Sequence, residues 1–438
     1  MSFNTDKQTL DELNLMGKFR QGSVYHLFNK VKTRGGERLL DEMFRHPLTN
    51  ADLINARSNV FLKFQEADLQ FPFDEQQLVQ MQEYIDSDSG SNAGMVLVKT
   101  AFKKVLSGLT RDERYRKSVQ GLQACIVTLN RCDTFLGSVR SSLGAFDQRM
   151  EKVRRILNDK HLANLRNLDI YAALPVKTLA FYEHLLQNRM KGEIEDLMQF
   201  IYEIDLNIAV SNVAKQKKFR YAIALAPEAN ILSAGELRHP CIDGAVGNIV
   251  NMDEKQNVVF LTGANMAGKS TLMKSVGIAL YIAHMGFPVA AAAMKFSVRD
   301  GLYSSINVAD NIGLGYSHFY AEVVRVKQAA DAAASGKRLL LMFDELFKGT
   351  NVKDAYDGTL AVTEAFAEYQ ECLFIVSTHI IEVGEALMQK NNIQFVFMPT
   401  VMEGVRPRYT YKLEQGITED RQGMLIIRNE GILEMLKG

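Results

Sequence analysis

Hydrophobic positions in the first half of the chain recur at intervals of three and four residues, which is the spacing of amphipathic helices. The clearest stretch is 181–219, FYEHLLQNRMKGEIEDLMQFIYEIDLNIAVSNVAKQKKF, whose apolar positions run from Leu185 to Ile208. A single helix of this length would exceed about 50 Å, at about 1.5 Å per residue, which is more than a compact domain needs. The pattern therefore predicts a helical first half braced by one long rod, with a loop at DSDSGSNAG (86–94).

From about residue 231 the pattern changes to short runs of β-branched and other apolar residues that alternate with helical stretches. The runs NVVFLT (257–262), KRLLLMF (337–343) and CLFIVST (372–378) lack alternation between apolar and polar positions. Strands of this kind are typical of a mostly parallel sheet that is covered on both faces. The second half is therefore predicted to be an α/β domain.

Two features complete this predicted organisation. The segment 395–416, FVFMPTVMEGVRPRYTYKLEQG, predicts antiparallel strands, and a short helix is expected from about Gln422. The seam between the two textures lies near residues 226–237. We therefore expect a multi-domain α and α/β protein with a helical domain over 1–230 and an α/β domain over 231–438.

The second half contains a phosphate-binding pattern between a strand and a helix. Gly263-x-x-x-x-Gly268-Lys269-Ser270 follows the apolar run 257–262 and precedes a helical stretch. Glycines let successive backbone N–H groups point toward phosphates, and a helix N-terminus adds partial positive charge. Lys269 is then expected to reach the outer phosphates and Ser270 to hold Mg²⁺, whereas the alternative is a surface turn that matches by chance.

Two further strand ends carry candidate catalytic side chains. RLLLMFDE ends in Asp344 and Glu345, the pair of carboxylates that a nucleotide hydrolase needs beside its P-loop. Asp344 would order Mg²⁺, and Glu345 would polarise the attacking water. VSTHI places His379 at the end of another strand, within reach of the γ-phosphate. Alone, these residues are more often solvated carboxylates and a structural histidine, but the P-loop upstream favours the catalytic interpretation.

Composition narrows the class of protein without changing this picture. Hydrophobic residues make up 47% and charged residues 23% of 438 positions, and the formal net charge is zero. No apolar run of about eighteen residues is present, so we expect no membrane role. The N-terminal sequence resembles no secretory signal, which favours a cytoplasmic location. The four cysteines have no CxxC or Cys/His spacing, which argues against a disulfide framework and a zinc site.

Taken together, these motifs resemble an ABC-class ATPase and, in detail, the MutS family of DNA mismatch repair ATPases. The loop GANMAGKST is close to that family's GPNMGGKST, and DELFKGTNVKDAYDG (344–358) is similar to its DEIGRGTSTYDG. ELRHP (236–240) and YTYKLEQGI (409–417) occupy corresponding places. In the first half, QTLDELNL (8–15) and 33–60 look like the family's helical core. The resemblance therefore implies a MutS core, or lever, domain followed by an ABC-type ATPase domain.

The resemblance also implies a mechanism. DNIGLGYSHF (310–319) stands in place of the signature loop, so Ser317 would face the γ-phosphate bound by a partner subunit. This implies a homodimer with two composite ATP sites, in which Glu345, His379 and Lys269 act in cis. The residues expected to bind the nucleotide are Gly263, Ala264, Asn265, Met266, Ala267, Gly268, Lys269, Ser270, Thr271 and Ile249, with Ser270 and Asp344 on Mg²⁺.

The sequence departs from the family pattern in the nucleotide site. Ala264 stands where the family has proline and Ala267 where it has glycine, and both are small enough for a P-loop. The family's adenine-stacking aromatic is replaced by Asn248. We expect Ile249, with Phe395, to pack against the base, which would loosen base selectivity.

The larger departure concerns DNA recognition. Mismatch repair members begin with a mismatch-reading domain, whereas here the core begins near residue 8, and the region before the ATPase is short for a full clamp. Phe64-Gln65-Glu66 matches the family's Phe-x-Glu reader in letters. It lies within a helical stretch of the core match, so we expect it to be structural.

Two functions remain open at this stage. The first is an ATPase in DNA transactions related to mismatch repair or recombination, which grips the DNA backbone through 101–118 or 151–156, possesses no mismatch reader and works with a repair protein. These basic clusters are more often solvated helix faces. The second is an interaction module whose nucleotide-driven dimerisation serves a protein partner without a DNA site. Salt-dependent DNA binding distinguishes the two.

Overall fold

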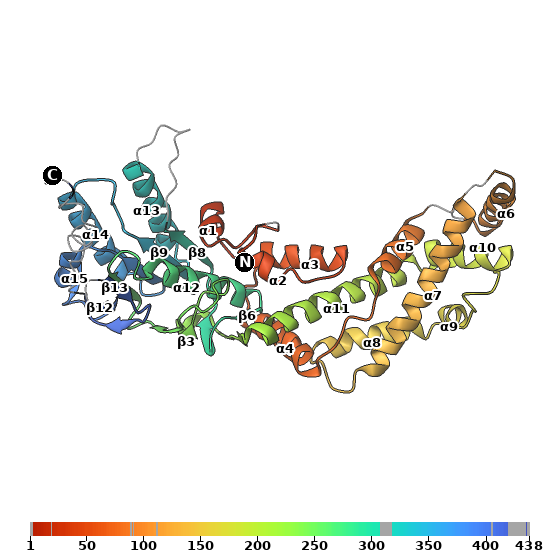
Figure 1. Ribbon diagram of the computed structural model, residues 1–438, viewed down its shortest axis with the longest axis horizontal. Helices are drawn as coiled ribbons and strands as arrows, with labels where there is room; N and C mark the ends of the chain where they lie inside the picture. The colour runs from red at the N-terminus through yellow and green to blue at the C-terminus, as the bar shows by residue number, and fades with distance from the viewer. Residues whose placement is uncertain are drawn as a thin grey trace. The chain divides into compact units, whose positions relative to one another are not determined.

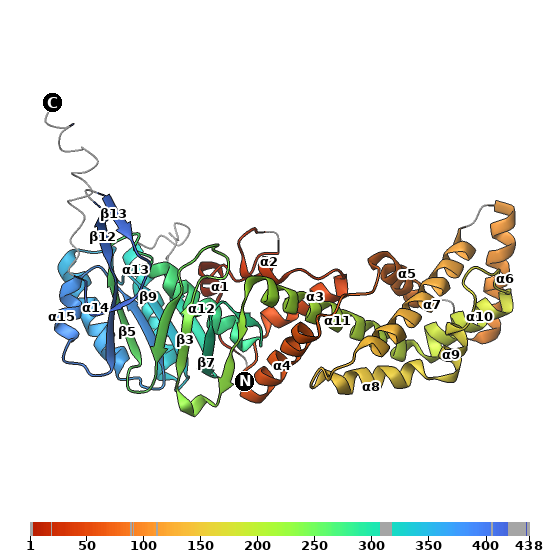
Figure 2. The ribbon, with the colours of Figure 1, turned by 60° about the horizontal axis from the view of Figure 1, so that its bottom comes forward.

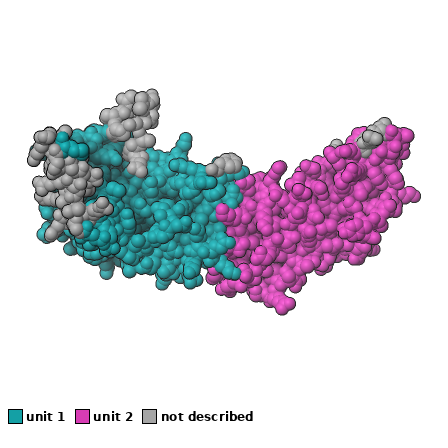
Figure 3. Space-filling model, viewed as in Figure 1, with its two compact units in different colours: residues 1–29, 42–58, 213–438 teal, residues 30–41, 59–212 magenta. Residues whose placement is uncertain are grey.

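The structure is a computed structural model (Figure 1) that describes residues 3–18, 20–87, 90, 92–110, 113–306, 318–403, 406–418 and 435. The chain forms two compact units, which Figure 3 shows in different colours. Unit 1 comprises Met1–Asn29, Glu42–Ser58 and Val213–Gly438, and unit 2 comprises Lys30–Asp41 and Asn59–Asn212. Grouping by contacts thus joins two N-terminal segments to the α/β part, whereas the boundary at residue 230 follows the change in sequence pattern and stays a prediction.

Unit 1 is built on a six-stranded sheet, in which five neighbouring strands are parallel and β14 at one edge is antiparallel. The order across the sheet is β14 (Glu414–Gln415), β11 (Ile393–Met398), β5 (Val258–Gly263), β10 (Leu373–Ser377), β9 (Leu339–Asp344) and β8 (Gly301–Ser305). Every residue of β5 and β10 is buried, as expected for strands covered on both faces. The predicted parallel α/β sheet is therefore confirmed.

Helices cover both faces of this sheet. Figure 2 shows α14 (Val352–Ala367) and α15 (Ile381–Leu387) on one side of β5 and α12 (Lys269–His284) on the other. α12 packs on the four strands β5, β8, β9 and β10, and α13 (His318–Ala334) packs on β8. The carboxyl ends of the central strands are therefore held by packing on both sides, which makes them a rigid platform for side chains.

Smaller sheets flank the central one. The predicted antiparallel strands in 395–416 are confirmed for β12 (Thr400–Glu403) with β13 (Arg406–Tyr409) and for β14 with β11, although β11 also runs parallel to β5. The helix expected from Gln422 lies outside the described residues. The remaining strands are β1 (Arg220–Tyr221) paired with β6 (Pro288–Val289), and a sheet ordered β2 (Ile223–Leu225), β7 (Ala293–Ser297), β3 (Leu232–Leu237) and β4 (Asn248–Met252).

The N-terminal segment packs onto the α/β sheet rather than onto the helices of unit 2. Asn4 bridges to Gly301 at the edge strand β8, and Arg325 of α13 forms an ion pair with Asp6. Further along, α1 (Lys7–Glu12) contacts β8, and the ring of Phe28 in α2 (Val24–Phe28) lies 5.1 Å from that of Phe287. The first 29 residues therefore belong to the same core as the ATPase motifs.

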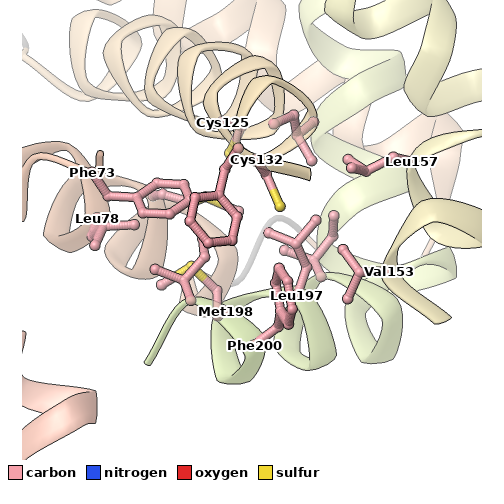
Figure 4. Packing of buried hydrophobic residues seen from close by; sticks show 14 of the residues in the cluster. Phe73, Leu78, Cys125, Cys132, Val153, Leu157, Leu197, Met198 and Phe200 are labelled. Atoms are coloured by element: carbon pink, nitrogen blue, oxygen red, sulfur yellow. The ribbon is translucent and has the colours of Figure 1, made fainter. Parts of the chain in front are cut away.

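Unit 2 is entirely helical among its described residues, and its core is one apolar cluster drawn in part in Figure 4. The cluster joins side chains from α5, α7, α8 and α11, including Leu78, Cys125, Val153 and Phe200. The helices of this unit, some continuing into unit 1, are α3 (Arg34–Arg45), α4 (Ala51–Ala67), α5 (Glu75–Asp86), α6 (Ala93–Thr110), α7 (Arg114–Ser138), α8 (Phe146–Leu157), α9 (Lys160–Arg166), α10 (Val176–His184) and α11 (Lys191–Lys217).

The single helix predicted over 181–219 is wrong, because the structure divides it into α10 and α11. A π-helical turn, η1 (Leu185–Arg189), separates the two, and Met190 N–H bonds to the carbonyl of Leu185. The amide of Gln187 donates to the carbonyl of Tyr84 at 2.6 Å, and Gln187 is buried. This tertiary hydrogen bond stabilises the irregular turn, and local periodicity does not report it.

The cysteines and the apolar helices agree with the expectations from composition. All four cysteines are free, and Cys125, Cys132 and Cys372 are buried, which raises the pKa of the Cys132 thiol to about 12. No helix in the described part of the chain is long and apolar enough to cross a membrane.

Candidate active site

The P-loop connects β5 to α12 in a conformation that requires glycine at both ends. Gly263 has φ of +143° and Gly268 has φ of +106°. A Cβ at Gly263 would stand 3.0 Å from the carbonyl oxygen of Met398, and one at Gly268 would stand 3.0 Å from the ring of Tyr411. Gly268 is also the N-cap of the sixteen-residue α12, whose first N–H groups have no partner within the helix. The loop therefore presents a partial positive charge at its mouth.

Inside this loop the small residues and the exposed residues divide. Ala267 is buried, so the methyl group that replaces the family's glycine points into the protein, and Ala264 is partly exposed. Asn265, Met266 and Thr271 are exposed around the mouth of the loop, and Met266 also has positive φ, +71°. The loop's outer rim is thus accessible to a ligand.

Lys269 lies under the loop, where its ammonium group is held by backbone carbonyls. Nζ donates to the carbonyl oxygens of Gly263 at 2.8 Å and of Ala264 at 3.2 Å, and the side chain is buried. Burial lowers the pKa of Lys269, while Asp344 and Glu345 oppose this shift. The cation is therefore partly desolvated and has only neutral acceptors, an arrangement that phosphate oxygens would improve.

Ser270 and Asp344 meet although they are far apart in the sequence. Oγ of Ser270 donates to Oδ2 of Asp344 at 2.5 Å. The other carboxylate oxygen, Oδ1, is buried and has no hydrogen-bond partner among the described residues. Burial raises the pKa of Asp344, and the Ser270 hydroxyl opposes the shift. A hydroxyl beside a carboxylate with one unsatisfied oxygen fits Mg²⁺, which binds oxygen ligands and few protein groups.

Glu345 and His379 come together from neighbouring strands. The register pairs Ser377 of β10 with Asp344 of β9, and Glu345 N–H donates to the carbonyl of Ser377 at 2.8 Å. Glu345 has φ of +54°, a left-handed conformation that turns the chain directly after the strand. Its Oε1 lies 3.6 Å from Nδ1 of His379. The adjacent imidazole lowers the pKa of Glu345, and the carboxylate raises that of His379.

The exposure of these two side chains differs. The His379 side chain is 57% exposed and that of Glu345 is 24% exposed. Glu345 therefore lies in the wall of the site as an ionised acceptor, and His379 lies at its edge. Ser317, the residue expected to act on a partner's nucleotide, lies outside the described residues, directly before α13.

A cavity of ≈320 Å³ opens beside the P-loop, between the β3–β4 connection and the start of α12. Its lining includes His239, Gly268, Thr271, Leu272 and Tyr411. Burial lowers the pKa of His239 to about 4, so this imidazole is neutral near pH 7. The cavity is mostly apolar with a few polar groups, which is typical of sites for a planar heterocycle.

The structure does not bring the two expected base-packing residues to this cavity. Ile249 is 63% exposed and lines a second cavity of ≈320 Å³ on the other side of β4. Phe395 lies on β11, with its ring 5.8 Å from that of Phe260 in the sheet. The aromatic residue beside the P-loop is Tyr411, which sequence reasoning missed even though it lies within YTYKLEQGI (409–417).

Asn248 has a structural role in this region. Its amide donates to the carbonyl of Tyr411 at 3.0 Å, and its Oδ1 accepts from Leu413 N–H at 2.8 Å. These bonds tie β4 to the segment after β13. Asn248 thereby positions the backbone of Tyr411 at the cavity.

The Phe64-Gln65-Glu66 stretch belongs to the helical core of unit 2. Phe64 is 1% exposed, and its ring packs edge-on against Phe146 with centroids 5.2 Å apart. Glu66 forms an exposed ion pair with Lys63 on the same helix. A buried ring has no access to stacked bases, which supports the structural interpretation of this stretch.

Several basic side chains in the two candidate DNA-binding stretches have carboxylate partners within unit 2. Lys103 pairs with the buried Glu183 at 2.8 Å, and Lys152 pairs with Asp196 at 2.9 Å. Arg154 lies 3.8 Å from Glu151 on its own helix. These partners reduce the positive charge that the two stretches offer to phosphates.

Comparisons with known proteins match both halves of the chain. The model of MutS domain III matches residues 8–240, and that of MutS domain V matches residues 259–435. The DNA mismatch repair protein MutS of Lactococcus lactis subsp. cremoris (strain SK11) is 22% identical over 79% of this chain and 43% of its own length. Its namesake in Bacillus cereus is 22% identical over 74% of this chain and 39% of its own length, and that of Streptococcus sanguinis (strain SK36) is 25% identical over 56% and 29%.

The chain thus spans less than half the length of these relatives. The domain III model alone covers more than half of the chain, and the domain V model covers the P-loop and both catalytic strand ends. The helical core and the mostly parallel α/β sheet agree with these two domains. The chain belongs to the MutS family.

Proposed function

We propose that this protein binds ATP with Mg²⁺ and hydrolyses it to drive a DNA transaction related to mismatch repair or recombination. The observation that carries the proposal is the contact between Ser270 and Asp344, together with the buried, unsatisfied Oδ1 of Asp344. Such an atom costs about 1–3 kcal/mol when it is left without a partner, which is hard to explain unless a ligand supplies one.

Each residue of the site has a distinct role in this proposal. Lys269 leaves the carbonyls of the loop and binds the outer phosphates, and the N–H groups at the start of α12 bind the others. Ser270 and Asp344 hold Mg²⁺, which supplies charge neutralisation at the bridging phosphate oxygens. Glu345, ionised because of His379, accepts a proton from the attacking water or orients it by a hydrogen bond. His379, exposed at the edge, donates to a terminal phosphate oxygen.

The adenine base fits the cavity beside the P-loop better than the surface around Ile249. The cavity is continuous with Gly268 and Thr271, so a nucleotide whose phosphates lie in the loop reaches it directly. Tyr411 would pack against the base. Few polar groups line the cavity, which supports loose base selectivity.

The DNA and dimer parts of the proposal rest on family membership. The relatives described above are named DNA mismatch repair proteins, and ATP sites of this class are completed by a second subunit, here through Ser317. A repair protein partner and the choice of DNA structure follow the same reasoning. Because Phe64 is buried, any DNA affinity of this chain would come from phosphate contacts rather than from an inserted ring.

Glu345→Gln tests the catalytic assignment. The amide keeps the shape of the carboxylate but is no base, so we expect ATP affinity to persist, turnover to fall at least 100-fold, and an ATP-bound dimer to accumulate in light scattering. Glu385→Gln, on the exposed surface of α15, is the matched control and should hydrolyse ATP at the wild-type rate. Wild-type turnover by Glu345→Gln would refute its role as base and make His379 the next candidate.

The DNA assignment needs a separate measurement. We expect the ATPase rate to change on addition of homoduplex or junction DNA, and DNA affinity to fall steeply as salt rises. No binding at low salt, with hydrolysis intact, would favour the interaction module that has a protein partner and no DNA site.

A further inference from the structure

Helix α6 of unit 2 presents an apolar face that no described residue covers. Met95, Val98, Phe102, Val105 and Leu109 are each 58–77% exposed. The opposite face of α6 is fully used, because Val96 and Thr100 are completely buried where α6 packs on α7 and α10. Figure 2 shows α6 at the end of unit 2 beside these two helices. The outward apolar residues are therefore not needed for folding of the unit.

The spacing of this face is that of a helix pairing seam. The five residues follow one another at intervals of three, four, three and four positions over α6 (Ala93–Thr110). A surface helix that packs on its own protein needs a wider stripe, whereas a strict alternation of three and four is the pattern by which two helices pair. The pattern thus points to a helix as the occupant.

Residues beside the seam permit close approach by a second helix. Gly94, Ala101 and Gly108 are exposed and recur every seven residues along one flank. No atom lies within 4 Å of the place where a Cβ on Gly108 would stand. The absence of side chains along this flank lets a second backbone come near, as small residues do wherever helices pack closely.

The charges on α6 are compatible with pairing to an identical helix. The helix carries lysines but no carboxylate, and Lys103 is already paired with Glu183 and Lys104 lies over the ring of Tyr115. In an antiparallel pair with its two-fold axis at Phe102, Lys99 lies level with apolar residues near Val105 of the partner subunit. No like charges then face each other across the seam, and the two helix dipoles offset each other.

From this geometry we infer that α6 pairs with α6 of a second copy of this chain. Burying roughly 100 Å² on each of the five seam residues and on Leu97 removes about 600 Å² per copy, or about 1,200 Å² in total, from water. This area lies at the lower limit of specific protein interfaces, so the contact forms a weak, concentration-dependent dimer with an isologous interface. The inference does not rest on the proposed function, because the ATP site lies in the other unit.

The first test measures the mass of the full-length, nucleotide-free protein by sedimentation over a concentration series. We expect wild type to rise from 49.2 kDa toward twice that mass, and Phe102→Asp to raise the dimer dissociation constant at least tenfold. Tyr171→Asp is the control, since Tyr171 is 92% exposed in the same unit and lies outside the seam. A wild type that stays monomeric to about 100 μM, or equal association of both variants, would overturn the inference.

A second test uses chemistry at the centre of the seam. Phe102→Cys should form a disulfide-linked dimer under mild oxidation, because a two-fold axis at this position brings the two thiols within bonding distance. Tyr171→Cys should not, and the buried native cysteines contribute little background. If Phe102→Cys stays monomeric while wild type binds anionic vesicles and Phe102→Asp does not, the face belongs to a lipid surface and the inference fails.

Discussion

Replacing Phe64 with alanine distinguishes a core residue from a reader of mismatched DNA. The ring is 1% exposed and packs against Phe146, whose ring in turn stacks on Phe200 at 5.4 Å. A buried phenylalanine removes about 150–250 Å² from water. At about 25 cal/mol per Å² this corresponds to about 4–6 kcal/mol for the whole side chain, of which alanine retains a small part.

We therefore expect Phe64→Ala to lower the free energy of unfolding of unit 2 by about 3–5 kcal/mol. For a unit of this size the melting temperature should fall by about 6–20 °C. Urea unfolding followed by the helical circular dichroism signal measures this difference. Glu66→Ala is the control, because Glu66 is exposed and its pair with Lys63 contributes little, so its effect should stay within about 0.5 kcal/mol.

The same variant should leave the ratio of affinities for mismatched and homoduplex DNA unchanged, near one for both proteins. Two outcomes would refute the reasoning. One is a loss of stability below about 1 kcal/mol, which would mean that the ring is not in the core. The other is a tenfold preference of wild type for the mismatch, about 1.4 kcal/mol, that disappears in Phe64→Ala.

Three further predictions concern the nucleotide site. In NMR titrations the pKa of His379 should lie above its ordinary value of 6.5 and fall toward it in Glu345→Gln, because the carboxylate stabilises the imidazolium; an unchanged pKa would separate the two residues. Tyr411→Ala should weaken ATP binding about tenfold by calorimetry while Tyr411→Phe does not, since the ring rather than the hydroxyl packs on the base; equal affinities would move the base elsewhere. Gly268→Ala should lose at least tenfold in ATP affinity, because its Cβ would press on Tyr411, whereas Gly336→Ala, also at positive φ but with open space around it, should keep wild-type affinity.

Local patterns in the sequence determined the parts of the site that lie within single strand-to-helix or strand-to-turn units. The P-loop from Gly263 to Ser270 and the pair Asp344 and Glu345 follow buried strands, and the structure has strands β5 and β9 at those places. Parallel strands of one sheet end at the same edge, so the prediction that these groups lie close together needed only the α/β pattern. The contact between Ser270 and Asp344 agrees with it.

Contacts between distant segments were decided only by the tertiary structure. Periodicity identifies an apolar face but does not state which neighbour covers it, and for this reason it missed that Phe28 packs on Phe287 and that Gln187 breaks the long helix by bonding to Tyr84. Tyr411 was missed for the same cause, because its place beside Gly268 depends on a fold-back of more than a hundred residues. The apolar residues of α6 look like core in the sequence, and only the packing of Val96 and Thr100 shows that the seam from Met95 to Leu109 faces outward.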